Sequence, residues 1–190
     1  MEKYFALDGE HLIGSEKDLE YLKYAESYKR TVMILMEVLE KSSSYFHFDV
    51  TPLLFNFRHY LELQMTGLIL YRLDLNKATQ LEFIRFMKKS RETHSLSFYV
   101  NNLENYDPNA NIPKEIKKAI IDMNQIDKKG DSFRYPESSK GLKHYRKSIN
   151  PNFYNKLANF NSLKSIIINC IKLFEEIKEG YEIEKYAKYI

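Results

Sequence analysis

The sequence predicts an all-α protein, and three observations support this prediction. Apolar residues recur at the i, i+3, i+4, i+7 spacing of a helix over several long stretches. Only 6 glycines and 5 prolines interrupt the 190 residues. No alternation of apolar and polar residues is long enough to build a sheet. We therefore expect a bundle of five or six helices in a single domain, residues 1–190.

Composition narrows the class of protein. Hydrophobic residues make up 44% of the chain and charged residues 29%, which is typical of a globular domain. The net charge of +3 is too small to imply a nucleic-acid partner by itself. A lone Cys170 excludes an intrachain disulfide and a cysteine zinc cluster. With no signal-peptide core and no membrane-length apolar run, we expect a cytoplasmic protein.

The first helix is expected from Ser15 to about residue 41, after an irregular lead-in over residues 1–14. Ser15 can cap this helix, and Asp18 and Glu20 stand in its first turn, where carboxylates interact favourably with the helix dipole. Its apolar positions keep helical spacing at Tyr21, Tyr24, Ala25, Tyr28, Val32, Leu35, Met36 and Leu39.

The second helix is expected over residues 51–73, with Thr51 as its N-cap and Pro52 as its first residue. It is apolar around nearly its whole circumference, which is typical of a central helix covered by its neighbours. A narrow polar stripe, within one ~100° sector, is the exception. This polar stripe consists of Arg58, His59, Glu62 and Thr66.

Four further helices complete the expected bundle. Two of them fall around residues 77–90 and 94–104, and a loop at 105–113 follows. Pro113 opens the next helix, and Gly180 is the expected stop of the last one, which begins near residue 154. Cys170 lies on the apolar stripe of that last helix, so we expect a core thiol rather than a nucleophile.

A basic, mostly irregular segment is expected over residues 128–152. It holds seven Lys or Arg residues against two carboxylates, a net charge of +5. The rest of the chain holds 22 basic and 24 acidic residues, a net charge of −2. An irregular stretch of this length inside a compact domain is usually functional or disordered. All of the positive excess of the protein therefore lies in this one segment.

The polar stripe is the first candidate site. Arg58 and Glu62 are four residues apart and His59 and Glu62 three apart, so both pairs can touch on one helical face. A carboxylate can orient an imidazole as acid or base, and Arg58 can bind a phosphate. Arg58, His59 and Glu62 are therefore the candidate catalytic residues. The alternative is a buried ion-pair network that fixes helix packing. No second helix supplies the ligands of a di-metal site, so no metal or cofactor is expected.

The second candidate set consists of ligand- or RNA-binding residues. His94 stands at a helix start, where it is either a second imidazole for the polar stripe or part of a cap beside Thr93. The basic segment mixes cations with aromatic residues, which suits single-stranded RNA or phosphate groups, or it is a solvated loop. The candidates in it are Arg134, Tyr135, Lys140, Lys143, Arg146 and Lys147. A further basic run over residues 85–91 can be the outer face of its helix.

Three short motifs resemble HEPN-like bacterial helical proteins: FRHYLEL at 57–63, THSL at 93–96, and SFRYP at 132–136 with a glycine downstream. The resemblance covers roughly residues 50–180. It implies an all-α bundle that commonly dimerises, in families linked to RNA cleavage, toxin–antitoxin pairs and phage defence. Catalytic members carry an arginine followed, after four to six residues, by a histidine. This chain has no such spacing, so no catalytic residue carries over from the family.

Three functions remain open from the sequence. The first is a HEPN-like module that binds RNA or a nucleotide without efficient catalysis, with the polar stripe as a pocket floor and residues 128–147 as a basic flap. The second is a metal-independent RNA endonuclease in which His59 is the acid or base, Glu62 orients it, and Arg58 or Arg134 stabilises charge. The third is an interaction module that forms a homodimer or binds an antitoxin or another protein.

Overall fold

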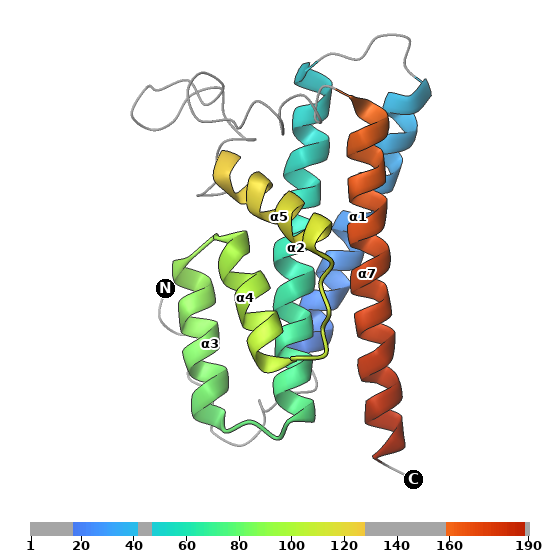
Figure 1. Ribbon diagram of the computed structural model, residues 1–190. Helices are drawn as coiled ribbons and strands as arrows, with labels where there is room; N and C mark the ends of the chain where they lie inside the picture. Colours follow the sequence, from blue (N-terminus) through green and yellow to red (C-terminus); the bar gives the residue numbers. More distant parts are fainter. Residues whose placement is uncertain (1–16, 42–46, 128–158, 189–190) are drawn as a thin grey trace.

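The computed structural model describes residues 17–41, 47–127 and 159–188, and these ranges are all-helical. This confirms the predicted all-α fold. The helices are α1 (Lys17–Lys41), α2 (His47–Leu75), α3 (Gln80–Glu92), α4 (Leu96–Tyr106), α5 (Lys114–Ile126) and α7 (Phe160–Ala187). Figure 1 shows their arrangement. The expected lead-in over residues 1–14 and the basic segment 128–152 lie outside the described residues.

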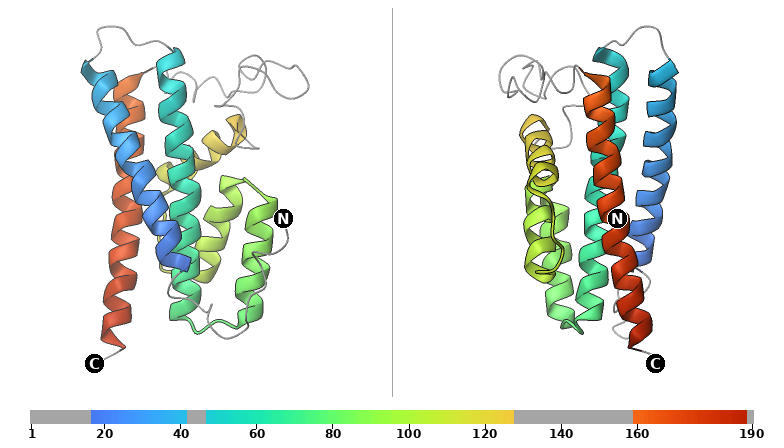
Figure 2. Two further views of the ribbon diagram at one scale, coloured as in Figure 1. Left: turned by 180° about the vertical axis from the view of Figure 1, so that it is seen from behind. Right: turned by 45° about the vertical axis from the view of Figure 1, so that its right-hand side comes forward.

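The long helix α2 is the centre of the bundle. The helices α1 and α7 run alongside it, and the shorter α3, α4 and α5 form a second group on its other side (Figures 1 and 2). The predicted central position of this helix is confirmed, because side chains around most of its circumference are buried. At Gly67 a Cβ atom would lie 2.7 Å from the side chain of Leu22, so α1 and α2 approach each other closely there.

Two predicted helix ends are wrong. The helix α2 begins at His47, upstream of Thr51, and Pro52 lies inside it. The additional turn carries Val50, which is buried in the core and so stabilises an earlier start. Likewise α7 continues through Gly180 to Ala187. The residue after that glycine, Tyr181, is buried and stacks on Tyr71 of α2, with ring centroids 5.8 Å apart. Packing therefore overrides both local stop signals.

Local sequence explains the other boundaries. Thr79 and Glu82 form a capping box at the start of α3, with the two side chains bonding each other's backbone N–H groups. Pro113 directly precedes α5, as predicted. The α3–α4 connection spans residues 93–95, and Ser95 is the N-cap of α4. This short connection carries His94 to the middle of α2.

Candidate functional site

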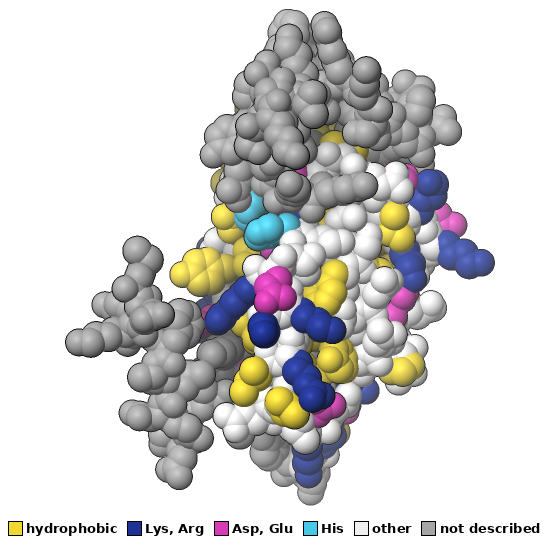
Figure 3. Space-filling model, turned by 90° about the vertical axis from the view of Figure 1, so that its left-hand side faces the viewer, with side chains coloured by type: hydrophobic (Ala, Val, Ile, Leu, Met, Phe, Trp, Pro, Cys, Tyr) yellow, Lys and Arg dark blue, Asp and Glu magenta, His cyan; other side chains and the backbone are white. Residues whose placement is uncertain are grey.

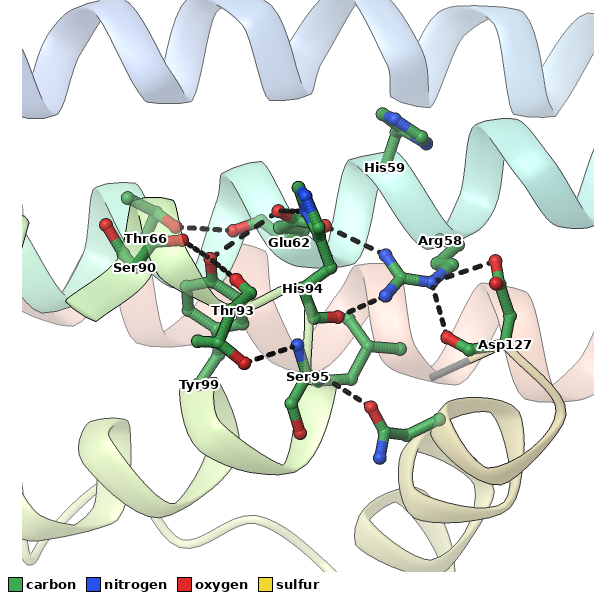
Figure 4. Close-up of polar contacts among 12 residues, drawn as sticks. Arg58, His59, Glu62, Thr66, Ser90, Thr93, His94, Ser95, Tyr99 and Asp127 are labelled. Carbon is green, nitrogen blue, oxygen red and sulfur yellow. Dashed lines mark hydrogen bonds and ion pairs between the residues drawn. The ribbon is translucent and has the colours of Figure 1, made fainter. Parts of the chain in front are cut away.

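The structure brings two residues of the polar stripe, Arg58 and Glu62, into a network of ion pairs and hydrogen bonds (Figure 4). We call Arg58, Glu62, His94, Tyr99 and Asp127 the Arg58 cluster. Two of its members come from α2, and the others come from the α3–α4 connection, from α4 and from the C-cap of α5.

Arg58 is the buried centre of this cluster, with 0% of its surface exposed. Its Nη1 donates to Glu62 Oε2 at 2.8 Å, and its Nη2 donates to the backbone carbonyl of His94. Its Nε lies 3.1 Å from the Asp127 carboxylate and 3.3 Å from the Asp127 carbonyl oxygen. Two carboxylates thus neutralise the guanidinium, and protein groups surround it. Arg58 cannot reach a ligand that approaches from solvent, so the ion-pair interpretation fits this residue.

Glu62 and His94 form the accessible part of the cluster. The Nδ1 atom of His94 lies 3.1 Å from Glu62 Oε1. The His94 side chain is 57% exposed, and that of Glu62 is 17% exposed. Contact with a carboxylate favours the tautomer in which Nδ1 carries the proton, which leaves Nε2 as an acceptor. An oriented imidazole of this kind can accept a proton from a bound molecule or donate one to it.

Tyr99 supports Glu62 from the α4 side. Its hydroxyl lies 3.0 Å from the Ser90 carbonyl oxygen, 3.3 Å from that of Thr93 and 3.5 Å from Glu62 Oε1. Burial raises the pKa of Tyr99, and the nearby charge of Glu62 raises it further, so the hydroxyl stays protonated and acts as a donor. Thr66, the last member of the stripe, donates from Oγ1 to the Glu62 carbonyl oxygen at 2.7 Å.

The α3–α4 connection that carries His94 is fixed on both sides. The Tyr99 hydroxyl lies 3.3 Å from the Thr93 carbonyl oxygen, and the Leu96 N–H donates to Asn124 Oδ1 of α5 at 2.7 Å. Together with the bond from Arg58 to the His94 carbonyl, these contacts hold the connection at its centre and at both ends. The imidazole is thereby positioned on a rigid scaffold rather than on a freely moving loop.

His59 does not form the predicted pair with Glu62. Its ring stacks on Tyr28 of α1 at a centroid distance of 5.3 Å and packs against Phe55 at 4.3 Å. Its Nδ1 lies 3.1 Å from the Phe55 carbonyl oxygen. Figure 4 shows the ring turned away from Glu62. The three-residue spacing allows His59 to pair with Glu62, but the His59 ring packs against α1 instead. The histidine that contacts Glu62 is His94.

The second basic run lies beside this site. Arg85, Lys88, Lys89 and Arg91 are exposed on α3, and we call them the α3 cationic face. Within the described ranges, no carboxylate forms an ion pair with Arg85, Lys88 or Lys89, whereas many other helical cations have one. Figure 3 shows Lys and Arg side chains gathered on this side of the molecule, close to histidine.

Arg91 connects the α3 cationic face to the Arg58 cluster. Burial raises the pKa of the Tyr21 hydroxyl on α1, the charge of Arg91 lowers it, and the carboxylates of Glu20 and Glu62 raise it. Arg91 and Glu62 are therefore both within electrostatic reach of the same hydroxyl.

A second cluster is built around Arg72, farther along α2. Arg72 Nη2 lies 3.7 Å from Asp107 Oδ1, and Nη1 pairs with Glu184 of α7. The Tyr181 hydroxyl donates to Asp107 Oδ2 at 2.8 Å. We call Arg72, Asp107, Tyr181 and Glu184 the Arg72 cluster. It forms one side of a cleft of about 370 Å³, which Gly180 also lines.

The remaining predictions divide into those that the structure tests and those that it does not. Cys170 is buried, and burial raises the pKa of its thiol to about 12, so the predicted core thiol is confirmed. Asp127 was not predicted as a site residue. The predicted RNA-binding residues of the basic segment lie outside the described residues: Arg134, Tyr135, Lys140, Lys143, Arg146 and Lys147.

Comparisons with known proteins found no match to this chain among family models, curated proteins or solved structures. Among the described residues, no group of three or more His, Cys, Asp or Glu side chains is arranged to hold a metal ion. None of the described helices combines the length and the apolar character needed to cross a bilayer.

Proposed function

We propose that this chain is a HEPN-like helical module that binds RNA through the α3 cationic face and His94. The observation that carries the proposal is the run of four exposed cations on α3, next to the exposed imidazole of His94. Within the described ranges, Arg85, Lys88 and Lys89 form no ion pair with a carboxylate. Lysine and arginine side chains bind phosphates with a gain in free energy from counterion release. The exposed His94 ring, just after the end of α3, adds a hydrogen-bond donor or acceptor.

Two further features favour RNA over a free phosphate ion. Leu81 and Ile84 are exposed on the same helix as the cations, at 53% and 52%. The unstacked bases of single-stranded RNA can cover such apolar side chains and remove them from water while the phosphates meet the cations. The charge of +5 on residues 128–152 acts in the same direction. A toxin–antitoxin or phage-defence setting is part of the proposal and rests on the resemblance to HEPN-like proteins.

A salt series tests binding directly. Filter binding with single-stranded RNA should give measurable affinity at about 50 mM salt and a loss on the order of tenfold or more at about 200 mM salt, because cation–phosphate contacts release counterions. Absence of binding at the lowest salt concentration would refute the proposal.

A matched pair of charge reversals tests the surface. The double variant Lys88→Glu/Lys89→Glu should weaken binding on the order of tenfold or more, because it removes two cations from the α3 cationic face. Lys23→Glu/Lys172→Glu makes the same change in net charge at two exposed lysines of α1 and α7 and should weaken it by about threefold or less. Equal losses in both variants would show that binding does not use α3.

The contact between His94 and Glu62 favours a second candidate function, RNA cleavage. His94 Nε2 would take the proton of a 2′-hydroxyl while Glu62 holds Nδ1. The 2′-oxygen would then bond to phosphorus, and the 5′-oxygen would leave with a proton from water, giving a 2′,3′-cyclic phosphate. Because the guanidinium of Arg58 is sealed, this cluster offers no cation for the developing charge, and efficient catalysis is not expected.

Product analysis separates binding from cleavage. Wild-type protein with chelator present should release cyclic-phosphate ends if the second function holds, and His94→Ala should abolish them. His59→Gln is the matched control, because that ring lies outside the cluster. Intact RNA and a non-toxic wild type in a bacterial host would leave binding as the function. Equal loss in the two histidine variants would refute the role of His94.

A further inference from the structure

The outer face of α1 carries a second stripe of uncharged residues, which no described helix covers. The helix uses its other face to pack on α2, through residues such as Val32 and Met36. Residues of the outer stripe alternate by three and four positions along the helix. We call them the α1 outer stripe: Tyr24, Ser27, Thr31, Ile34 and Val38. All five are exposed. This spacing is that of the a and d positions in a coiled coil.

The two aliphatic hydroxyl groups of the α1 outer stripe, those of Ser27 and Thr31, need no hydrogen bond to water. The Ser27 hydroxyl donates to the Lys23 carbonyl oxygen at 3.2 Å, and the Thr31 hydroxyl donates to the Ser27 carbonyl oxygen at 3.1 Å. Their donors are therefore satisfied within the helix. The apolar members are open to solvent, with Ile34 61% and Val38 59% exposed. Covering this stripe therefore removes apolar surface from water and leaves the hydroxyl donors of Ser27 and Thr31 paired.

We propose that the α1 outer stripe pairs with the same stripe of a second copy of this chain, with the two helices antiparallel. Small residues, Ser27 and Thr31, precede the larger Ile34 and Val38 along the stripe. An antiparallel register that places Thr31 opposite Ile34 of the second copy also places Ser27 opposite Val38. Both of these layers then join a small residue to a large one, as close packing requires.

Charge favours the same register. In antiparallel coiled coils the g positions of the two helices flank the core and face each other. In this register Arg30 lies across from Glu37 of the second copy, and the two-fold axis repeats that pair. Their side chains are 74% and 65% exposed in the single chain, and among the described residues each has its ion-pair partner within its own helix. A parallel pairing would instead place Ser27 opposite Ser27 and Val38 opposite Val38, without these ion pairs.

Sedimentation of the full chain tests the pairing. Between about 1 and about 200 µM protein, the wild type should shift from monomer to dimer, since one helix pair is a small interface. Ile34→Glu/Val38→Glu should stay monomeric with unchanged helix content, because both side chains are exposed. Ile183→Glu, at a 70% exposed position of α7, is the control and should dimerise normally. A monomeric wild type, or a dimer that survives the double variant, would overturn the inference.

A charge exchange tests the antiparallel register. Arg30→Glu should weaken dimerisation by about three- to tenfold, because it places two carboxylates face to face. Adding Glu37→Arg in the same chain restores the pair with its signs reversed and should recover most of the affinity. If the exchanged variant is weaker than the single variant, the proposed register is wrong.

Discussion

The Arg58 and Arg72 clusters are built in the same way at two levels of one helix. The two arginines stand on α2 about four turns apart. Each contacts an aspartate that caps the end of a short helix, Asp127 after α5 and Asp107 after α4. Each also pairs with a glutamate. An arginine of the central helix thus fixes the end of a shorter helix in both places.

The two clusters differ in what else the carboxylates contact. Asp107 receives the hydroxyl of Tyr181, whose pKa is raised by burial, so the acceptor meets a permanent donor. Glu62 instead holds the solvent-facing imidazole of His94. This difference indicates that the arginine has a structural role in both clusters. The Arg58 cluster is a candidate site because its glutamate, Glu62, contacts the exposed imidazole of His94.

The largest expected effect comes from removing each arginine. Arg58→Met should lower the free energy of unfolding by about 3–5 kcal/mol, because it leaves two buried or half-buried carboxylates without their cation. Arg72→Met should cost about 1–2 kcal/mol, because water can solvate the Glu184 carboxylate and Asp107 keeps the Tyr181 hydroxyl as a donor. Urea denaturation of both variants measures the difference. Equal losses of stability would contradict the expectation that the buried Arg58 contributes more than the partly exposed Arg72.

A smaller effect is expected from the two tyrosines. Tyr181→Phe removes the donor to the buried carboxylate of Asp107 and should cost about 1.5–3 kcal/mol. Tyr99→Phe removes a bond of 3.0 Å to a neutral carbonyl and should cost about 0.5–1.5 kcal/mol. The same denaturation experiment ranks them. A larger loss for Tyr99→Phe would mean that its hydroxyl donates to Glu62 rather than to the backbone.

The smallest effect concerns the cleft beside the Arg72 cluster. Gly180→Ala should raise the free energy of unfolding by about 0.5–1 kcal/mol, because the added Cβ meets nothing within 4 Å in the interior of α7. Gly67→Ala is the matched contrast and should destabilise, since its Cβ would lie 2.7 Å from Leu22. Stabilisation in both variants would show that α1 and α2 separate easily.

Sequence periodicity predicts the helices well, because each apolar stripe is a local property. The central position of α2 and the burial of Cys170 both follow from it. The earlier start of α2 and the continuation of α7 depend on Val50 and Tyr181 meeting partners elsewhere in the fold. No local signal reports such contacts.

The sequence predicted two residues of the Arg58 cluster on α2 but not all of the partners that complete it. The apolar context of α2 singles out Arg58 and Glu62. Their partners come from far along the chain, with His94 32 residues beyond Glu62 and Asp127 69 residues beyond Arg58. Spacing within one helix favoured His59, since a pattern of residues cannot show which histidine a distant connection brings to a carboxylate.

One guanidinium bonds both the backbone of His94 and the final described residue before the basic segment, Asp127. The α3–α4 connection that carries His94 and the C-cap of α5 are therefore joined to α2 through one side chain. Removing that side chain would take a hydrogen bond from both at once.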